Sequence, residues 1–270
     1  MPEGHTLHRL ARLHQRRYAG KPVAVSSPQG RFAADAALVD GRKLVRADAH
    51  GKHLFHRYGP DAIVHVHLGL IGVFDEFKLP EPDPVGQVRL RMLGATHGTD
   101  LRGPTICELI DEARVAAIRA RLGPDPLRKD ADPEQAFKRI SRSKLPIAAL
   151  LMDQSVLAGV GNVYRAELLF RHNVYPYLAG RDVSHELWKA MWEDLVELMR
   201  YGVKTGRIDT VWPEHDPKVT GREPRKDRHG GEVYVYRRAG MACLICGAEV
   251  QMADLDGRRL YWCPVDQPAP

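Results

Sequence analysis

Three of the four cysteines lie in the last thirty residues, at a spacing typical of metal ligands. Cys243 and Cys246 form a Cys-x-x-Cys pair, and after sixteen intervening residues Cys263 and Asp266 have the same spacing. Two short loops that each offer two ligands are the pattern of a zinc ribbon, and a carboxylate can serve as the fourth ligand although it is harder than a thiolate. We expect these four residues to hold a structural zinc ion. A finger without metal is the alternative.

A hairpin that carries a basic residue is predicted between the two ligand pairs. Asp256-Gly257 stands among strand-like residues, and Asp-Gly is a strong signal for a two-residue hairpin turn. Arg258 then lies at or beside the tip, where its guanidinium could grip two phosphate oxygens. An ordinary surface arginine is the alternative, and spacing alone does not separate the two.

A glycine-rich turn between two apolar helical stretches is a second candidate for phosphate binding. Gly159, Gly161 and Asn162 lie within the stretch 154–170. The stretch is not a dinucleotide-binding fingerprint, because the glycine spacing differs and no strand precedes it. Exposed backbone N–H groups that open into a helix near Asn162 would suit a phosphate. From this stretch alone, a simple glycine turn that joins two helices and binds nothing is an equally good interpretation.

Basic residues outnumber acidic ones and gather in two places. Lys and Arg total 40 against 34 Asp and Glu, which gives a formal charge of +6 and a pI near 9.2. Residues 4–34 contain six basic side chains and no acidic one, and residues 138–144 form a second acid-free cluster. Such clusters are usually solvated surface, but these two favour a nucleic-acid partner. The sequence has no apolar stretch typical of a membrane span or a signal peptide, so we expect a cytoplasmic protein.

The first segment opens with a predicted helix and then has the pattern of β-structure. Leu7, Ala11 and His14 follow helical spacing. Residues 64–68 and 88–92 alternate apolar side chains with His or Arg, which predicts half-buried strands. Short strands separated by Gly and Pro favour a β-sandwich.

Helices dominate the second half of the sequence. A Pro- and charge-rich stretch at 123–134 is the predicted linker, and strand is predicted again from Glu232. Between them we predict helices at 134–141, 146–157, 163–172 and after Ser184, then a polar loop at 205–231. The expected fold is α+β and multidomain, with a β-sandwich domain at 1–125, a helical domain at 126–231 and a zinc-finger β-hairpin at 232–270.

Several motifs, taken in order, resemble the formamidopyrimidine-DNA glycosylase and endonuclease VIII family over nearly the whole chain. They are PEGHTLHR at the start, HGKHLF around Lys52, HLGLIG at 67–72, LAGVGNVYRAELL, CLICG and YWCPVDQ. The Pro-Glu-Gly start is more similar to the endonuclease VIII branch. The resemblance implies a β-sandwich, a helix-two-turn-helix domain and a zinc finger, with damaged double-stranded DNA bound in the cleft between the two main parts. We expect a monomer.

The activity implied by the resemblance is that of a bifunctional DNA glycosylase and AP lyase of base excision repair. After loss of Met1, the secondary amine of Pro2 would attack C1′ of the lesion nucleotide and form an imine that permits elimination. A terminal amine suits this role because its pKa is about 8, so part of it is already neutral near pH 7. Glu3 is implied in proton transfer and Lys52 in a catalytic phosphate contact. Branch resemblance favours oxidised pyrimidines as substrates.

Further residues match the contacts that the family makes with DNA. His67, Asn162 and Arg258 align with phosphate contacts around the flipped nucleotide, and Leu70 aligns with the loop that fills the gap left by the base. Thr6 is a departure, because family members commonly have glutamate there. This difference could alter the polarity of the site or its base preference.

Three other functions compete with this interpretation. A catalytically silent protein that binds damaged DNA would keep the turn and the finger but would form no covalent adduct with abasic DNA. An RNA-binding module is a weaker alternative, because it does not account for the Pro-Glu start and Lys52. A zinc-dependent nucleobase deaminase is weaker still, since no His-x-Glu precedes a Pro-Cys-x-x-Cys motif.

Overall fold

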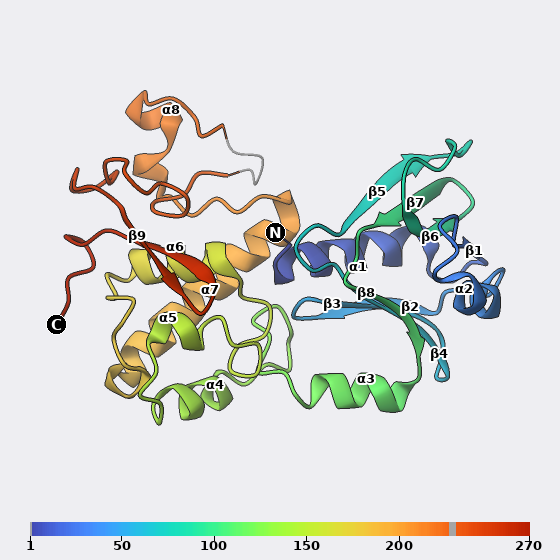
Figure 1. The fold of residues 1–270 in the computed structure, drawn as a ribbon, viewed down its shortest axis with the longest axis horizontal. Helices are drawn as coiled ribbons and strands as arrows, with labels where there is room; N and C mark the ends of the chain where they lie inside the picture. The colour runs from blue at the N-terminus through green and yellow to red at the C-terminus, as the bar shows by residue number, and fades with distance from the viewer. Residues whose placement is uncertain (1, 227–230) are drawn as a thin grey trace. The chain divides into compact units, whose positions relative to one another are not determined.

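The chain folds into two compact units, one ending at Arg121 and the other beginning at Leu122 (Figure 1). These are seen in a computed structural model that describes residues 2–226 and 231–270. Met1, whose removal the proline chemistry requires, lies outside the described residues, as do residues 227–230 of the predicted polar loop. The segment predicted as a linker at 123–134 belongs to the second unit, where Gly123 N–H donates to the Gln154 carbonyl at 2.9 Å.

The first unit is a β-sandwich with an opening helix. One antiparallel sheet has the strand order β1-β6-β7-β5 and the other has the order β2-β3-β4-β8. The elements are α1 (Gly4–Tyr18), β1 (Ala24–Ser26), α2 (Ala33–Val39), β2 (Arg46–His50), β3 (His53–Gly59), β4 (Ala62–His67), β5 (Val73–Lys78), β6 (Val88–Leu93), β7 (His97–Arg102), β8 (Ile106–Ile110) and α3 (Glu112–Arg119).

The predicted helical stripe and strands form the core of this sandwich. Leu7 and Ala11 of α1 are buried with Val64 and Leu90 from the two sheets. The alternation predicted one buried and one exposed face for each strand. In β4 both faces contain buried side chains, because His65 is only 1% exposed. The rings of His53 and Phe55 on β3 stack against His65 with centres 5.1 Å away, and Arg119 of α3 lies over the Phe55 ring with its Cζ 5.7 Å from the ring centre.

The second unit is helical and ends in a two-stranded hairpin. Helix α6 is buried along nearly its whole length, so it forms the centre of this unit, and α5, α7 and β10 pack against it. The elements are α4 (Pro133–Ile140), α5 (Ile147–Leu150), α6 (Asn162–Arg171), η1 (Gly180–Asp182), α7 (His185–Thr205), η2 (Pro213–His215), α8 (Pro217–Thr220), β9 (Gln251–Leu255) and β10 (Arg258–Trp262). The expected α+β class, with sandwich, helical unit and cysteine-bearing hairpin, is confirmed.

Two predicted elements are wrong in this unit. The helix expected at 146–157 stops after Leu150 and gives way to turns. The strand expected from Glu232 does not form, although Val and Tyr alternate there. The reason is the buried carboxylate of Glu167, which accepts the backbone N–H groups of Tyr234, Val235 and Tyr236 at 2.7 to 2.9 Å. A charged acceptor takes the hydrogen bonds that a neighbouring strand would otherwise receive.

Candidate functional site

The start of α1 places the predicted nucleophile beside a buried carboxyl group. Pro2 is half-buried, and Glu3 is fully buried in extended backbone as the N-cap residue. The carbonyl of Glu3 accepts the N–H of Thr6 at 2.9 Å, which begins the helix. Burial, followed by the charge of Arg9, lowers the pKa of His5 to about 4, so the first turn contains a neutral imidazole. Thr6, the departure from the family pattern, lies 3.3 Å from this ring through its hydroxyl.

Lys52 occupies the tip of a tight hairpin. Strand β2 ends at His50 and β3 begins at His53, and these two residues are paired, so Gly51 and Lys52 form a two-residue turn. Gly51 has φ +55°, which suits the turn type with glycine at its first central position. The strands therefore hold Lys52 at a defined point, with histidines at the base of its hairpin.

His67 ends β4, and the exposed loop with Leu70 follows it. His67 Nδ1 accepts the N–H of Gly69 at 3.2 Å, and its carbonyl accepts the N–H of Thr105 at 2.9 Å. Lys52 directly precedes His53, which pairs with His67, so strand register brings these two candidates close together. Burial and then the charge of Lys52 lower the pKa of His67. Leu70 and Ile71 are 55% and 81% exposed, so the two apolar side chains of this turn are available to a partner.

Asn162 and the hairpin are joined within the second unit. The turn before α6 is held by Gln154, whose Oε1 accepts the N–H of Gly159 at 3.0 Å and whose Nε2 donates to Val160 at 3.0 Å. Asn162 is the first residue of α6, and its Nδ2 donates to the carbonyl of Arg259 at 2.9 Å. The glycine turn and the hairpin were predicted separately from the sequence, and this hydrogen bond joins them in the structure.

The predicted Asp-Gly turn is confirmed. Asp256 and Gly257 have φ of +50° and +69°, and Leu255 pairs with Arg258 across the turn. Two positive φ values in sequence match the right-handed twist of the flanking strands. Arg258 is half-buried at the start of β10, directly after this turn.

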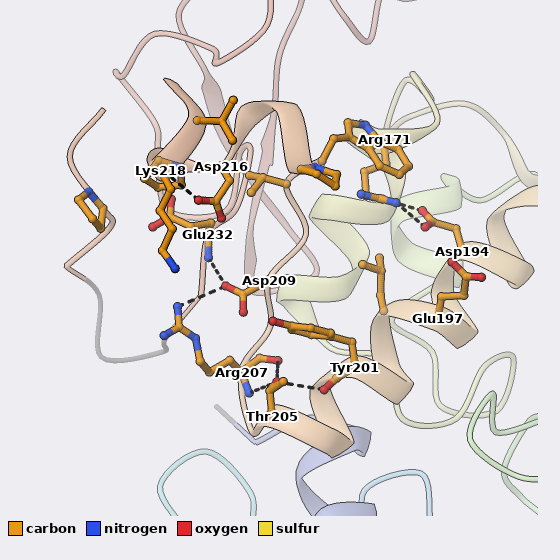
Figure 2. Close-up of a pocket in the computed structure, with 17 residues that line it drawn as sticks. Arg171, Asp194, Glu197, Tyr201, Thr205, Arg207, Asp209, Asp216, Lys218 and Glu232 are labelled. Carbon is orange, nitrogen blue, oxygen red and sulfur yellow. Dashed lines mark hydrogen bonds and ion pairs between the residues drawn. The ribbon is translucent and has the colours of Figure 1, made fainter. Parts of the chain in front are cut away.

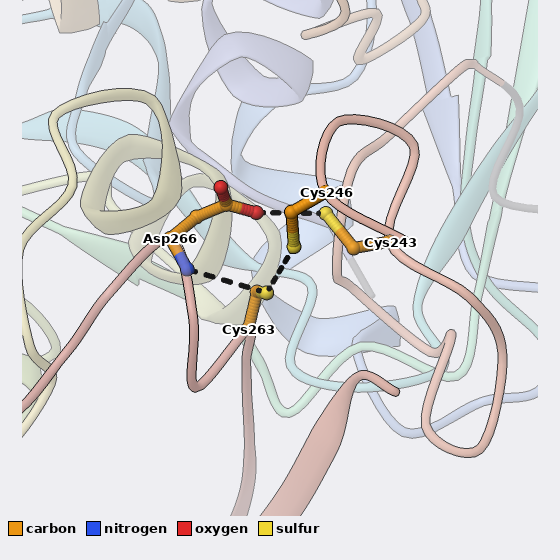
Figure 3. A group of neighbouring side chains, drawn as sticks. All are labelled: Cys243, Cys246, Cys263 and Asp266. Atoms are coloured by element: carbon orange, nitrogen blue, oxygen red, sulfur yellow. Dashed lines mark hydrogen bonds between the residues drawn. The ribbon is translucent and has the colours of Figure 1, made fainter. Parts of the chain in front are cut away.

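The four predicted metal ligands converge at one point (Figure 3). The sulfur atoms of Cys243, Cys246 and Cys263 and a carboxylate oxygen of Asp266 all lie within 4.8 Å of one another. Sulfur atoms bound to one tetrahedral zinc ion at 2.3 Å would lie about 3.8 Å apart, and the Cys246–Cys263 separation is 3.4 Å. Backbone N–H groups of Ile245 and Asp266 also approach sulfur atoms, at 3.4 and 3.5 Å. The donor set and its size therefore fit zinc.

The second unit contains a cavity of about 1030 Å³ (Figure 2). It is lined by the second half of α7 and by residues from 207 to 224, together with Arg171 and Glu232. Many of its charged groups bind one another, as Arg171 does with Asp194 at 2.6 and 2.7 Å. None of the candidate residues is among the described residues that line it.

The sequence analysis missed a group of polar residues in the first unit. His53, His65 and Glu108 are linked by hydrogen bonds on one face of the second sheet. His14 and Glu76 form a further, partly buried contact at 2.9 Å. Alternation in 64–68 was the available signal, but it placed the histidines toward water, whereas His65 is buried. Within the parts of the chain that the structure describes, no helix combines the length and apolar character that crossing a membrane requires.

Two family models match the chain. The formamidopyrimidine-DNA glycosylase N-terminal domain matches residues 1–106, and the H2TH domain of the same enzyme matches residues 122–212. Endonuclease 8 1 of Mycobacterium tuberculosis is 58% identical over 99% of this chain and 100% of its own length. Formamidopyrimidine-DNA glycosylase of Thermus thermophilus is 31% identical over 86% of this chain and 85% of its own.

A solved structure shows the same fold. It is a complex between the Lactococcus lactis enzyme and DNA that contains an abasic site, with a TM-score of 0.79 at 22% identity, covering 99% of this chain and 100% of that one. The two family models and the two relatives match this chain over the same regions that the solved structure covers. The chain therefore belongs to the formamidopyrimidine-DNA glycosylase family of DNA-repair enzymes, together with the endonuclease 8 proteins that it resembles.

Proposed function

We propose that this protein is a bifunctional DNA glycosylase and AP lyase that excises oxidised bases from double-stranded DNA, with oxidised pyrimidines preferred. The observation that carries the proposal is the placement of Pro2 directly before the buried Glu3 at the start of α1. The positive end of a helix dipole disfavours a protonated amine and stabilises a carboxylate. Both effects suit an amine that must act as a nucleophile beside a proton-transfer group.

The covalent chemistry uses the terminal amine that is left when Met1 is removed. The nitrogen of Pro2 forms a bond to C1′ while the bond between C1′ and the base breaks, and the departing base takes up a proton. The Pro2 nitrogen loses its proton, and the C1′–O4′ bond then breaks as Glu3 gives a proton to O4′, which opens the sugar ring and leaves an iminium between C1′ and that nitrogen. Loss of a proton from C2′ breaks the 3′ C–O bond and releases the phosphate. Glu3 is the proposed proton-transfer group for the sugar.

DNA would be held by groups from both units. Lys52 and His67 are the proposed phosphate contacts of the first unit, with Leu70 filling the gap left by the flipped base. Asn162 and Arg258 are the proposed phosphate contacts of the second. The Lactococcus relative binds abasic DNA, and the basic clusters of this chain would supply sequence-independent affinity through counterion release. We propose that the enzyme acts as a monomer.

Zinc is the proposed structural metal of the finger. Cys243, Cys246, Cys263 and Asp266 would hold it, and its role is to fix the two ligand loops at the base of the hairpin that bears Arg258. The proposed organisation is a catalytic β-sandwich at 1–125, a helix-two-turn-helix domain at 126–231 and the finger at 232–270.

Borohydride trapping tests the proposal directly. Processed protein is incubated with duplexes that contain thymine glycol, 8-oxoguanine or an abasic site, and the crosslinked peptide is mapped. We expect an adduct at Pro2, faster excision of thymine glycol than of 8-oxoguanine, and a strongly reduced adduct with Pro2→Gly, whose terminal amine is primary; full trapping by this variant would contradict the assignment. DNA binding without any trapped adduct would identify a silent damage-binding protein. An adduct at an internal residue would overturn the proline mechanism, and comparable excision of the two lesions would overturn the pyrimidine preference.

A further inference from the structure

One face of the second sheet carries a row of polar side chains, of which only His67 has a place in the proposed site. Strand register places His53 opposite His67 and His65 opposite Glu108. Side chains alternate along a strand, so these four residues lie on the same face. Val64 and Val66 belong to the other face, which packs into the core of the sandwich.

Hydrogen bonds join three of these residues into a chain. Glu108 Oε1 is 2.9 Å from His65 Nδ1, and His65 Nε2 is 2.9 Å from His53 Nδ1. The ring centres of His53 and His67 are 5.0 Å apart. Phe55 stacks against His65 at 5.1 Å with an interplanar angle of 18°, which limits rotation of that ring. The chain therefore runs from an acidic residue on β8 to the base of the Lys52 hairpin.

The acidic end determines which nitrogen carries each proton. A carboxylate can only accept a hydrogen bond, so His65 Nδ1 must be the donor to Glu108. In a neutral His65 the Nε2 atom is then an acceptor, and His53 Nδ1 donates to it. A neutral His53 is left with Nε2 as an acceptor. One carboxylate thus sets two tautomers.

The surroundings keep both imidazoles uncharged near neutral pH. Burial lowers the pKa of His53 to about 3, and the charges of His65, His67, His50 and Arg121 act in the same direction. Burial also lowers the pKa of His65, with Glu108 opposing this shift and Arg114 adding to it. Near neutral pH, His53 and His65 therefore contribute hydrogen bonds to this row and no positive charge.

We propose that Glu108, His65 and His53 are positioning residues that fix the protonation pattern beside Lys52 and His67. Lys52 and His67 would then have their hydrogen-bond donors in position before DNA binds. This lowers the entropic cost of ordering these side chains on binding. This inference rests on the proposed function, because it assigns the row to the phosphate side of that site.

Substitutions at Glu108 test the chain without disturbing the core, because the Glu108 side chain is 42% exposed. Glu108→Gln keeps an acceptor oxygen for His65, whereas Glu108→Ala removes it. The matched control is Glu112→Ala, which removes the same charge from an exposed partner of Arg57. Nitrogen-15 NMR of the histidine rings reports the tautomers, and the Kd for a duplex with a tetrahydrofuran abasic analogue reports the phosphate contacts.

We expect the Nδ1–H tautomer at His53 and His65 in the unmodified protein and in Glu108→Gln. In Glu108→Ala we expect His65 to shift toward Nε2–H and the Kd to rise roughly fivefold, the effect of one lost hydrogen bond. Unchanged tautomers in Glu108→Ala would overturn the proposal. So would an equal loss of affinity in Glu108→Gln, which would make charge the cause. If even the unmodified protein fails to bind the abasic analogue, the proposed function fails, while the NMR measurement still judges the hydrogen-bonded chain.

Discussion

Asn162 donates from Nδ2 to the carbonyl of Arg259 at 2.9 Å, across a separation of 97 residues. Arg165 donates to the same carbonyl at 3.0 Å. These bonds attach the start of α6 to β10, next to Arg258. The first residue of α6 is therefore tied to the strand that begins with Arg258, so two candidate phosphate contacts belong to elements that are bonded to each other.

We expect Asn162→Ala to weaken both the attachment and DNA binding. The change removes the bond to the Arg259 carbonyl and the bond that Arg165 donates to Asn162 Oδ1. At about 1 kcal/mol for each bond, the free energy of unfolding should fall by roughly 2 kcal/mol, measured by urea denaturation. The control is Arg259→Ala, which removes an exposed side chain but keeps the accepting carbonyl, so its free energy of unfolding should hardly change. Equal stability of Asn162→Ala and the unmodified protein would show that Arg165 alone holds the hairpin.

Glu3→Gln should separate base removal from the chemistry of an abasic site. The amide has nearly the same shape as the buried carboxyl but cannot transfer a proton, so excision of a damaged base should fall by roughly 100-fold or more. A preformed abasic site has no base to release, so borohydride trapping there should be reduced much less. Both are measured on matched duplexes. If Glu3→Gln excises thymine glycol at the normal rate, Glu3 is not the proton-transfer group.

Arg258→Ala should change the dependence of DNA binding on salt. If Arg258 neutralises one phosphate, the slope of log Kd against log salt should fall by about 1. Fluorescence anisotropy over a range of salt concentrations measures this slope. Arg237→Ala is a comparison within the same unit, and its slope should change less. An unaltered slope for Arg258→Ala contradicts the assignment.

Asp266 should set the strength of zinc binding. We expect one zinc ion per chain by mass spectrometry, weaker retention against a chelator for Asp266→Ala, and stronger retention for Asp266→Cys because thiolate is the softer ligand. Removal of zinc should also lower the thermal stability of the finger. Protein purified from zinc-supplemented medium that contains no metal would favour the metal-free finger.

Stability should fall on acidification before the carboxylates titrate. The pKa of His5 is lowered from 6.5 to about 4 by burial, so between these values the unfolded chain binds a proton that the folded chain does not. Stability is therefore complete above about pH 6.5 and declines toward pH 4, with a contribution from His5 on the order of 3 kcal/mol. Urea denaturation at a series of pH values measures the decline. In His5→Gln this part of the slope should disappear, and an identical slope in both proteins would exclude His5 as the cause.

Some elements of the fold could be predicted from the sequence because local residues determine them. The Asp256-Gly257 turn was predictable because positive φ at two successive residues is a local requirement that few dipeptides meet. Helix α7 was predictable from Ser184, whose side chain accepts the N–H of Leu187 at 3.1 Å, together with the apolar stripe that follows. The strand expected from Glu232 failed because its backbone donors bind Glu167, 65 or more residues earlier in the chain.

The sequence by itself determined the motifs, the ligand spacing of the finger and the class of each unit, because these depend on neighbouring residues and on short-range periodicity. Tertiary structure alone decided that Asn162 meets Arg259, that Lys52 lies near His67, and that Glu108, His65 and His53 form a chain. Such contacts depend on strand register and on which surface a distant helix covers. A hydrogen bond forms only when both partners are brought within about 3 Å, and residue order does not encode that distance locally.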